Sequence, residues 1–216
     1  YIKRREIHRL KQSFVEENIL VVDSVSGTGG INIEMDKWNI DVIFTASQKA
    51  LMAPPGLSFV AINDKGWKRI EKVDNQKYLF NFKRDREYLQ RNLTVHTPAT
   101  HTMLAVREAL MMIFEEGLEN VFKRHEENAR RVREGVKELG FKVLAKNDSI
   151  ASPTITTIYV KDHAEYYVNE LAKYHIYVGS GKGKMNKDTF RIGTMGYVSH
   201  HDVTALLSVL EKIVNQ

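Results

Sequence analysis

Two short apolar runs, each leading into polar residues, constrain the fold of this chain more than any other feature. Residues 19–22 (Ile-Leu-Val-Val) end at Asp23, and residues 41–44 (Asp-Val-Ile-Phe) lead to Lys49 and a rigid turn at residues 53–56 (Ala-Pro-Pro-Gly). Such runs are typical of strands buried in a parallel sheet. Because α/β sheets bind ligands at the carboxyl ends of their strands, we expect Asp23 and Lys49 to face a ligand together.

An Asp after one strand and a Lys beyond the next are the two groups that a pyridoxal phosphate enzyme needs. The amine of Lys49 would form a Schiff base with the cofactor aldehyde, and Asp23 would keep the pyridine nitrogen protonated. A lone Lys is usually a solvated charge and a lone Asp a turn residue, so only the combination favours this hypothesis. Ser24, Ser26 and the pair Gly29-Gly30 follow Asp23 and leave room for a flat ligand.

These residues also resemble a known family. The resemblance rests on residues 22–30 (Val-Asp-Ser-Val-Ser-Gly-Thr-Gly-Gly), Trp38, Asp41, residues 45–56 (Thr-Ala-Ser-Gln-Lys-Ala-Leu-Met-Ala-Pro-Pro-Gly), residues 95–98 (Val-His-Thr-Pro) and residues 190–193 (Phe-Arg-Ile-Gly). Together they are similar to the class V aminotransferases, and most similar to the serine–pyruvate / alanine–glyoxylate branch. The block around Lys49 is the most specific match, and the resemblance spans most of the chain.

The resemblance implies a role for each matching residue. Lys49 would hold pyridoxal 5'-phosphate and shuttle the proton between the substrate α-carbon and the cofactor. Asp23 would pair with the pyridinium nitrogen, and Gln48 would reach the cofactor phosphate. Val25 would pack beneath the ring, although plain core packing explains it equally well. Arg191 would clamp the substrate carboxylate with two parallel hydrogen bonds.

A partner subunit is implied as well. Thr97 matches a family hydroxyl that binds the cofactor phosphate of the neighbouring subunit, so we expect a homodimer with its active site at the interface. The chain departs from the family at Thr94, where a tyrosine is often found, which removes the basis for a second contact of this kind. The implied reaction is transamination between alanine or serine and glyoxylate or pyruvate.

Apolar periodicity predicts alternating strands and helices, and hence an α/β chain. The resemblance implies the type I fold of pyridoxal-phosphate-dependent transferases, with a mixed, mostly parallel sheet in the large domain and a smaller C-terminal α+β domain. We place the boundary at Gly117, so that residues 1–117 belong to the large domain and residues 118–216 form the small one. Residues 78–92 resist assignment. Strands are predicted near residues 19–22, 41–44, 57–62, 141–145, 154–160, 176–178 and 189–192, and helices near residues 2–17, 65–73, 99–116, 118–139, 163–174 and 199–214.

Composition and charge argue against several other classes of protein. A hydrophobic content of 43% suffices for a core, and no window is long and apolar enough to span a membrane or resembles a signal, so we expect a cytoplasmic protein. The absence of cysteine argues against cysteine desulfurases, which need one downstream of the Lys. The net charge is only +5, and the basic cluster at residues 3–9 is explained more simply as a solvated helix face than as a nucleic-acid site. No spacing among the eight histidines predicts a metal site.

The family pattern also contains a part that this sequence lacks. Family members carry a long stretch ahead of the Asp strand, with a phosphate-binding loop at a helix N-terminus and an aromatic residue that stacks on the cofactor. We therefore expect these 216 residues to be the second half of a longer polypeptide and to be inactive alone. Two alternatives stay open: a phosphoserine or aminoethylphosphonate transaminase of the same fold, and a non-enzymatic binding fragment.

Overall fold

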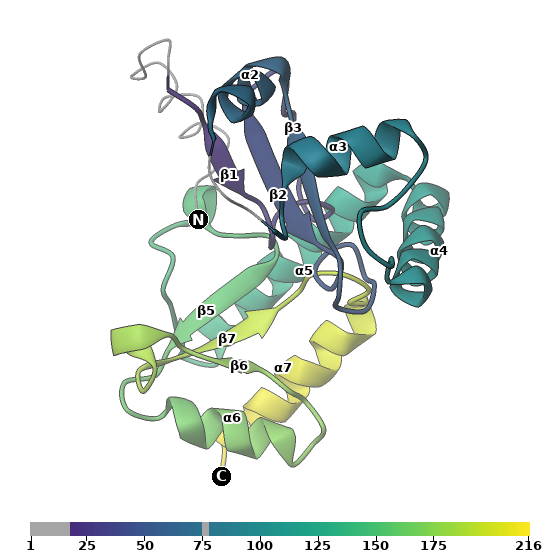
Figure 1. Ribbon diagram of the computed structural model, residues 1–216. Helices are drawn as coiled ribbons and strands as arrows, with labels where there is room; N and C mark the ends of the chain where they lie inside the picture. Colours follow the sequence, from purple (N-terminus) through teal and green to yellow (C-terminus); the bar gives the residue numbers. More distant parts are fainter. Residues whose placement is uncertain (1–17, 75–77) are drawn as a thin grey trace.

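The computed structural model describes residues 18–74 and 78–216, which form two β-sheets with helices around them (Figure 1). The first sheet contains β1 (Val21–Asp23), β2 (Val42–Ala46) and β3 (Ser58–Ile62), in that order. β1 and β2 are parallel, and β2 and β3 are antiparallel. The three strands predicted here are confirmed with small shifts at their ends, and the helix predicted at residues 2–17 lies outside the described residues.

Four helices follow the first sheet, and the chain then builds a second, antiparallel sheet. The helices are α2 (Asp64–Lys72), α3 (Phe82–Gln90), α4 (Thr100–Glu116) and α5 (Leu118–Glu138). The second sheet has the strand order β4 (Lys142–Val143), β5 (Ile155–Tyr159), β7 (Thr189–Gly193) and β6 (Gly179–Ser180). The remaining helices are α6 (Ala164–Ala172), α7 (His200–Val214) and the short 3-10 turns at Asp148–Ile150 and Gly183–Met185. The described part of the chain is thus mixed α/β, as expected from its sequence.

Two segments differ from the sequence prediction. The prediction of a strand at residues 176–178 is wrong, because β6 begins at Gly179. Ile176 and Val178 are apolar because they pack against the core of the second sheet, and not because they pair in it. The unassigned segment contains α3, which the side chain of Asn81 caps by accepting the N–H of Arg84. No residue of α3 is buried, so it lacks the buried apolar face that α5 and α7 show.

A buried carboxylate fastens the start of the first sheet. The Oδ2 atom of Asp41 accepts the N–H of Leu20 at 2.8 Å, and its Oδ1 atom accepts the side-chain amide of Asn63 at 3.0 Å. The Nζ atom of Lys65 lies 3.8 Å from Oδ2 and balances its charge. A buried charge without such partners would be costly. Asp41 therefore sets the parallel register that places Asp23 opposite Phe44.

The main core lies between the second sheet and the helices α5 and α7. It joins residues of each element, including Val132 and Val136 of α5, Ile158 of β5, Phe190 of β7 and Leu210 of α7, all fully buried. A smaller cluster of Leu51, Ile113 and Val121 joins the turn after β2 to α4 and α5. In the described part of the chain, no helix is long and apolar enough to cross a membrane.

Candidate active site

Lys49 lies on a tight turn that directly follows β2. Ser47 is fully buried and closes the turn, because its Oγ atom donates to the carbonyl of Pro54 at 2.6 Å and accepts the N–H of Leu57 at 3.3 Å. The carbonyl of Lys49 accepts the N–H of Met52 at 3.0 Å, and Met52 has a left-handed φ of 63°. These bonds hold the backbone of Lys49 in place whatever its side chain binds.

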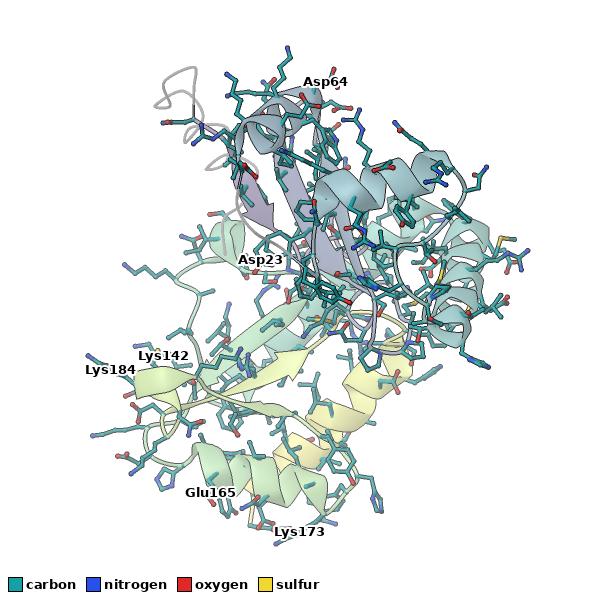
Figure 2. All side chains as sticks on the ribbon, viewed as in Figure 1. Asp23, Asp64, Lys142, Glu165, Lys173 and Lys184 are labelled. Atoms are coloured by element: carbon teal, nitrogen blue, oxygen red, sulfur yellow. The ribbon has the colours of Figure 1, made fainter. Side chains whose placement is uncertain are left out.

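Asp23 ends β1 and begins the loop of residues 24–31. Its Oδ1 atom accepts the N–H of Val25 at 3.0 Å, and the N–H of the next residue, Ser24, donates to the carbonyl of Phe44 on β2 at 2.9 Å. Figure 2 shows Asp23 at the end of β1 nearest the second sheet. The carboxylate is exposed and Val25 is half-buried. Oδ2 is thus available for a ligand at the edge of the sheet.

The remaining candidates come from three different places. Arg191 lies in β7, opposite Thr157 and Gly179, and its Nε atom donates to the carbonyl of Ser180 at 2.8 Å. This bond orients the guanidinium and leaves the N–H groups of both Nη atoms for a carboxylate. Gln48 is exposed on the turn beside Lys49, and Thr97 is exposed on the segment between α3 and α4.

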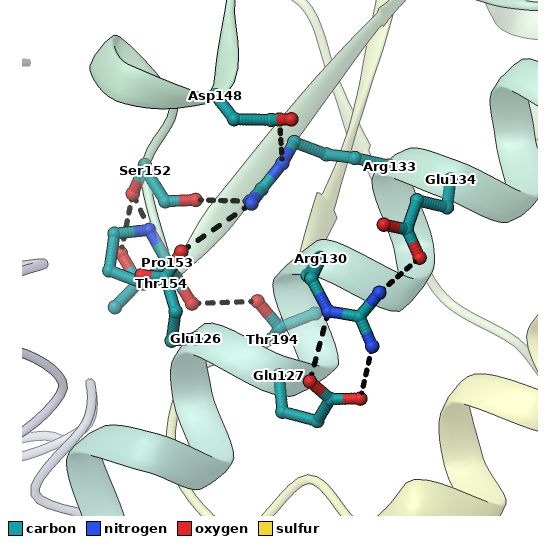
Figure 3. Close-up of polar contacts among 10 residues, drawn as sticks. All are labelled: Glu126, Glu127, Arg130, Arg133, Glu134, Asp148, Ser152, Pro153, Thr154 and Thr194. Atoms are coloured by element: carbon teal, nitrogen blue, oxygen red, sulfur yellow. Dashed lines mark hydrogen bonds and ion pairs between the residues drawn. The ribbon is translucent and has the colours of Figure 1, made fainter.

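The loop after Asp23 is joined to the second sheet by Thr154, a residue that the sequence did not single out. Thr154 is fully buried, and its Oγ1 atom donates to the carbonyl of Ser26 at 2.9 Å. Thr194, which follows β7, donates its N–H to the carbonyl of Thr154 at 2.9 Å and its hydroxyl to the carbonyl of Pro153 at 3.1 Å (Figure 3). The strand of Arg191 is thereby tied to the loop of Asp23.

Gly30 is required where these segments meet. A Cβ atom at Gly30 would lie 2.6 Å from Cγ2 of Thr154, closer than real Cβ atoms approach a neighbour, and 3.3 Å from Cδ2 of His125, which is a tight contact. It would also lie 3.4 Å from the Cβ of Ala50, the residue after Lys49. The small residues after Asp23 thus allow close packing of the loop, where the sequence suggested only space for a ligand.

An ion pair on α4 and α5 holds the loop after β7. Arg124 makes two bonds to Glu116, from Nε to Oε1 at 2.7 Å and from Nη2 to Oε2 at 2.8 Å, and its Nη1 atom donates to the carbonyl of Gly196 at 2.7 Å. The hydrogen bonds from Arg124 hold the pKa of Glu116 below its usual range. A second bond from α5, between Asn128 and the carbonyl of Val198 at 2.8 Å, supports the same loop.

His125 follows Arg124 on α5 and contacts the same loop, and sequence reasoning missed it. It is fully buried, and its Nε2 atom accepts the N–H of Gly196 at 3.0 Å. The signal in the sequence is its position four residues after Val121 and four before Ala129, on the buried face of α5. That spacing predicts a buried histidine, but the loop that it contacts lies 71 residues further along the chain.

The residues present fit pyridoxal phosphate. Its pyridine nitrogen needs an anion and its aldehyde an amine, which Asp23 at the end of β1 and Lys49 on the turn after β2 would supply. In the part of the chain that the structure describes, the side chain of Lys49 has no hydrogen bond or ion pair, and Asp23 has one to the backbone of Val25. The two groups are therefore free to bind a cofactor that would pair with both.

Comparison with known proteins gives consistent results. The model of the aminotransferase class-V family matches residues 4–206. A soluble hydrogenase small subunit of a Synechococcus strain is 31% identical over 198 residues, which cover 91% of this chain and 51% of that protein. A serine–glyoxylate aminotransferase of Arabidopsis thaliana is 30% identical over 215 residues, covering 96% of this chain and 53% of that one. The crystal structure of an alanine–glyoxylate aminotransferase from Nostoc sp. superposes with a TM-score of 0.87 at 27% identity, covering 97% of this chain and 56% of that one. The chain spans about half the length of the curated relatives it matches.

Proposed function

Because this chain belongs to the class V aminotransferase family, we propose that it carries pyridoxal 5'-phosphate on Lys49 and transfers an amino group from a small amino acid to a 2-oxo acid. Alanine or serine is the proposed donor, and glyoxylate or pyruvate the proposed acceptor. The observation that carries this proposal is the pairing of β1 with β2, which brings an anion and an amine to one sheet edge. Membership in a family of enzymes argues against a non-enzymatic binding fragment.

Each site residue has a proposed task. The bound cofactor supplies an aldehyde and an electron-withdrawing ring that weakens the bonds at the substrate α-carbon. Lys49 holds the cofactor and, once the substrate has taken its place, moves a proton from the α-carbon as general base. Asp23 keeps the ring nitrogen protonated through its negative charge. Gln48 donates its amide to the phosphate, and Val25 packs beneath the ring.

Arg191 is the proposed carboxylate site, and we expect Arg191→Lys to raise KM and lower kcat/KM for every amino and 2-oxo acid alike. An ammonium group cannot form two parallel hydrogen bonds to a carboxylate, so the expected loss is about 2 kcal/mol or more. Steady-state kinetics with alanine and serine measure it. Arg130→Lys, at an exposed position on α5, is the matched control and should leave KM unchanged. An unchanged KM for alanine and serine in Arg191→Lys would rule out this role.

The assembly and the domain division form a further part of the proposal. We propose a cytoplasmic homodimer in which Thr97 reaches the cofactor phosphate of the partner, with residues 1–117 in the large domain and residues 118–216 in the small one. The exposure of Thr97 supports this, as does the apolar surface of α4, where five large side chains are exposed. They are Met103, Leu104, Met111, Met112 and Phe114. Sedimentation of the complete protein measures the assembly, and a monomer with full activity would contradict it.

A panel of amino and 2-oxo acids tests the proposed reaction. The complete protein, supplied with pyridoxal phosphate, should transfer the amino group of alanine or serine to glyoxylate or pyruvate, as measured by mass spectrometry of the products. Phosphoserine or aminoethylphosphonate as the better donor by about a hundredfold in kcat/KM would favour the alternative transaminases of this fold. A complete protein that neither binds the cofactor nor forms any product would refute the proposal.

A further inference from the structure

Two loops that follow proposed site residues meet at the buried ring of His125, and one of them packs on the turn that carries Lys49. The loop after Asp23 approaches the ring at Gly30, where an added Cβ atom would lie 3.3 Å from Cδ2 of the ring. The loop after Arg191 approaches it at Gly196, which donates its N–H to Nε2 at 3.0 Å. A Cβ atom at Gly196 would lie 3.4 Å from the carbonyl oxygen of Lys49, so this loop also packs directly on the lysine turn.

The two hydrogen bonds of the ring fix its protonation state. Nδ1 lies 2.7 Å from the carbonyl of Val121, which can only accept, so Nδ1 carries a hydrogen. Nε2 faces the N–H of Gly196, which can only donate, so Nε2 carries a lone pair. His125 is therefore neutral in this structure, and a proton added at Nε2 would point at another N–H and break the bond to Gly196.

Burial opposes that added proton. Desolvation is the main reason that the pKa of His125 lies below 6.5, with the positive charge of Arg124 acting in the same direction; the bond to Val121 and the charge of Glu116 oppose it. The other segments against the ring add few charges. Residues 24–31 and 150–154 contain none, residues 194–198 contain only the titratable Tyr197, and the turn of residues 47–52 contains Lys49.

We propose that neutral His125 is a positioning residue that holds the loop after Arg191 against the turn that carries Lys49, and that its protonation separates the substrate-carboxylate site from the cofactor site. This inference rests on the proposed function, since it assigns His125 to the geometry of that same site. His125 touches neither cofactor nor substrate in this proposal. It acts through Gly196, five residues beyond Arg191 on the same backbone.

The direction of the pH effect follows from the lowered pKa. The unfolded chain takes up a proton at His125 near pH 6.5, whereas the folded chain does so only at a lower pH. The contribution of this group to stability is thus complete above about pH 6.5 and is lost as the pH falls toward the folded pKa. As the pH falls toward the folded pKa of His125, KM for the amino acid should rise, because Gly196 loses its hydrogen-bond acceptor.

Two variants of the complete protein separate positioning from packing. His125→Gln keeps an acceptor near the place of Nε2 but cannot be protonated, so it should retain KM at pH 7.5 and lose the acidic rise in KM. His125→Leu fills the space without an acceptor, and it should raise KM about tenfold at pH 7.5 with a smaller change in kcat, the usual scale for one buried hydrogen bond. His163→Gln, at an exposed histidine before α6, is the matched control and should behave as the wild type.

Nitrogen NMR of histidine-labelled protein reads the ring itself, independently of activity. The wild-type signals of His125 are identified by their absence from the spectrum of His125→Gln. At pH 7.5 they should show a protonated Nδ1 and an unprotonated Nε2. The opposite tautomer, or a charged ring, would overturn the inference. The inference would also be overturned if His125→Gln and His125→Leu both kept the wild-type KM at every pH while Lys49 still carried the cofactor. A wild-type protein without cofactor on Lys49 would instead refute the proposed function, and with it the assigned role of His125.

Discussion

In the Lys49→Ala variant, we expect no covalently attached cofactor and a fall in transamination of about ten-thousandfold or more. The variant loses both the amine that holds the cofactor and the general base that moves the α-proton, and a positioned base alone contributes about a hundredfold to ten-thousandfold. The turn itself should persist, because Ser47 and the backbone of Lys49 make its hydrogen bonds. Folding and catalysis can therefore be separated in this variant.

Borohydride reduction followed by peptide mapping tests the same assignment chemically. Reduction converts the link between cofactor and lysine to a stable amine, which we expect on the peptide that contains Lys49 in the wild type. Lys68→Ala, at an exposed lysine of α2, is the matched control and should keep both the label and the activity. Reduced cofactor on any other lysine of the wild-type protein would contradict the assignment of Lys49.

The second large effect is expected at Asp23. Asp23→Asn should fold normally, because the side-chain carbonyl of asparagine can still accept the N–H of Val25. It should lose about a hundredfold or more in kcat, since a neutral amide no longer stabilises the protonated ring nitrogen, and one such charge partner in a preorganised site is worth several kcal/mol.

Turnover and cofactor content, measured on the same preparation, separate the effects of this change. We expect the Asp23→Asn variant to bind pyridoxal phosphate and to turn over slowly. Asp36→Asn, at an exposed position in the segment before β2, serves as the control and should leave turnover unchanged. Near-normal turnover of Asp23→Asn would mean that Asp23 is only a turn residue.

The parts of the fold that were predictable from the sequence are those set by neighbouring residues. The apolar runs before Asp23 and Lys49 are β1 and β2, and Gly117, with a left-handed φ of 84°, separates the two long helices where a break was expected. Ser199 begins α7 as its cap, with Asp202 completing the capping box. In each case the signal lies within a few residues, so local sequence suffices to read it.

The contacts that position the site were not predictable in this way. Thr154, Arg124 and His125 act on segments 70 or more residues away, and nothing in their immediate neighbours indicates those partners. The segment of residues 176–178 shows the same limit, because an apolar residue that packs on a sheet looks like one that pairs in it. Sequence thus indicates which groups are candidates for the chemistry, and the structure shows which contacts hold their loops together.

The hydrogen bond between Thr154 and Ser26 has a consequence for how the protein folds. It joins residues 128 positions apart, whereas the bond from Leu20 to Asp41 that starts the first sheet spans only 21. Distant contacts form late, because the long intervening chain must be ordered first, and a chain emerging from the ribosome folds its early segments first. We therefore expect the lysine turn to exist well before its surroundings. On this order of events, the proposed cofactor site is complete only once Thr154 docks onto the loop after Asp23 and His125 onto Gly196.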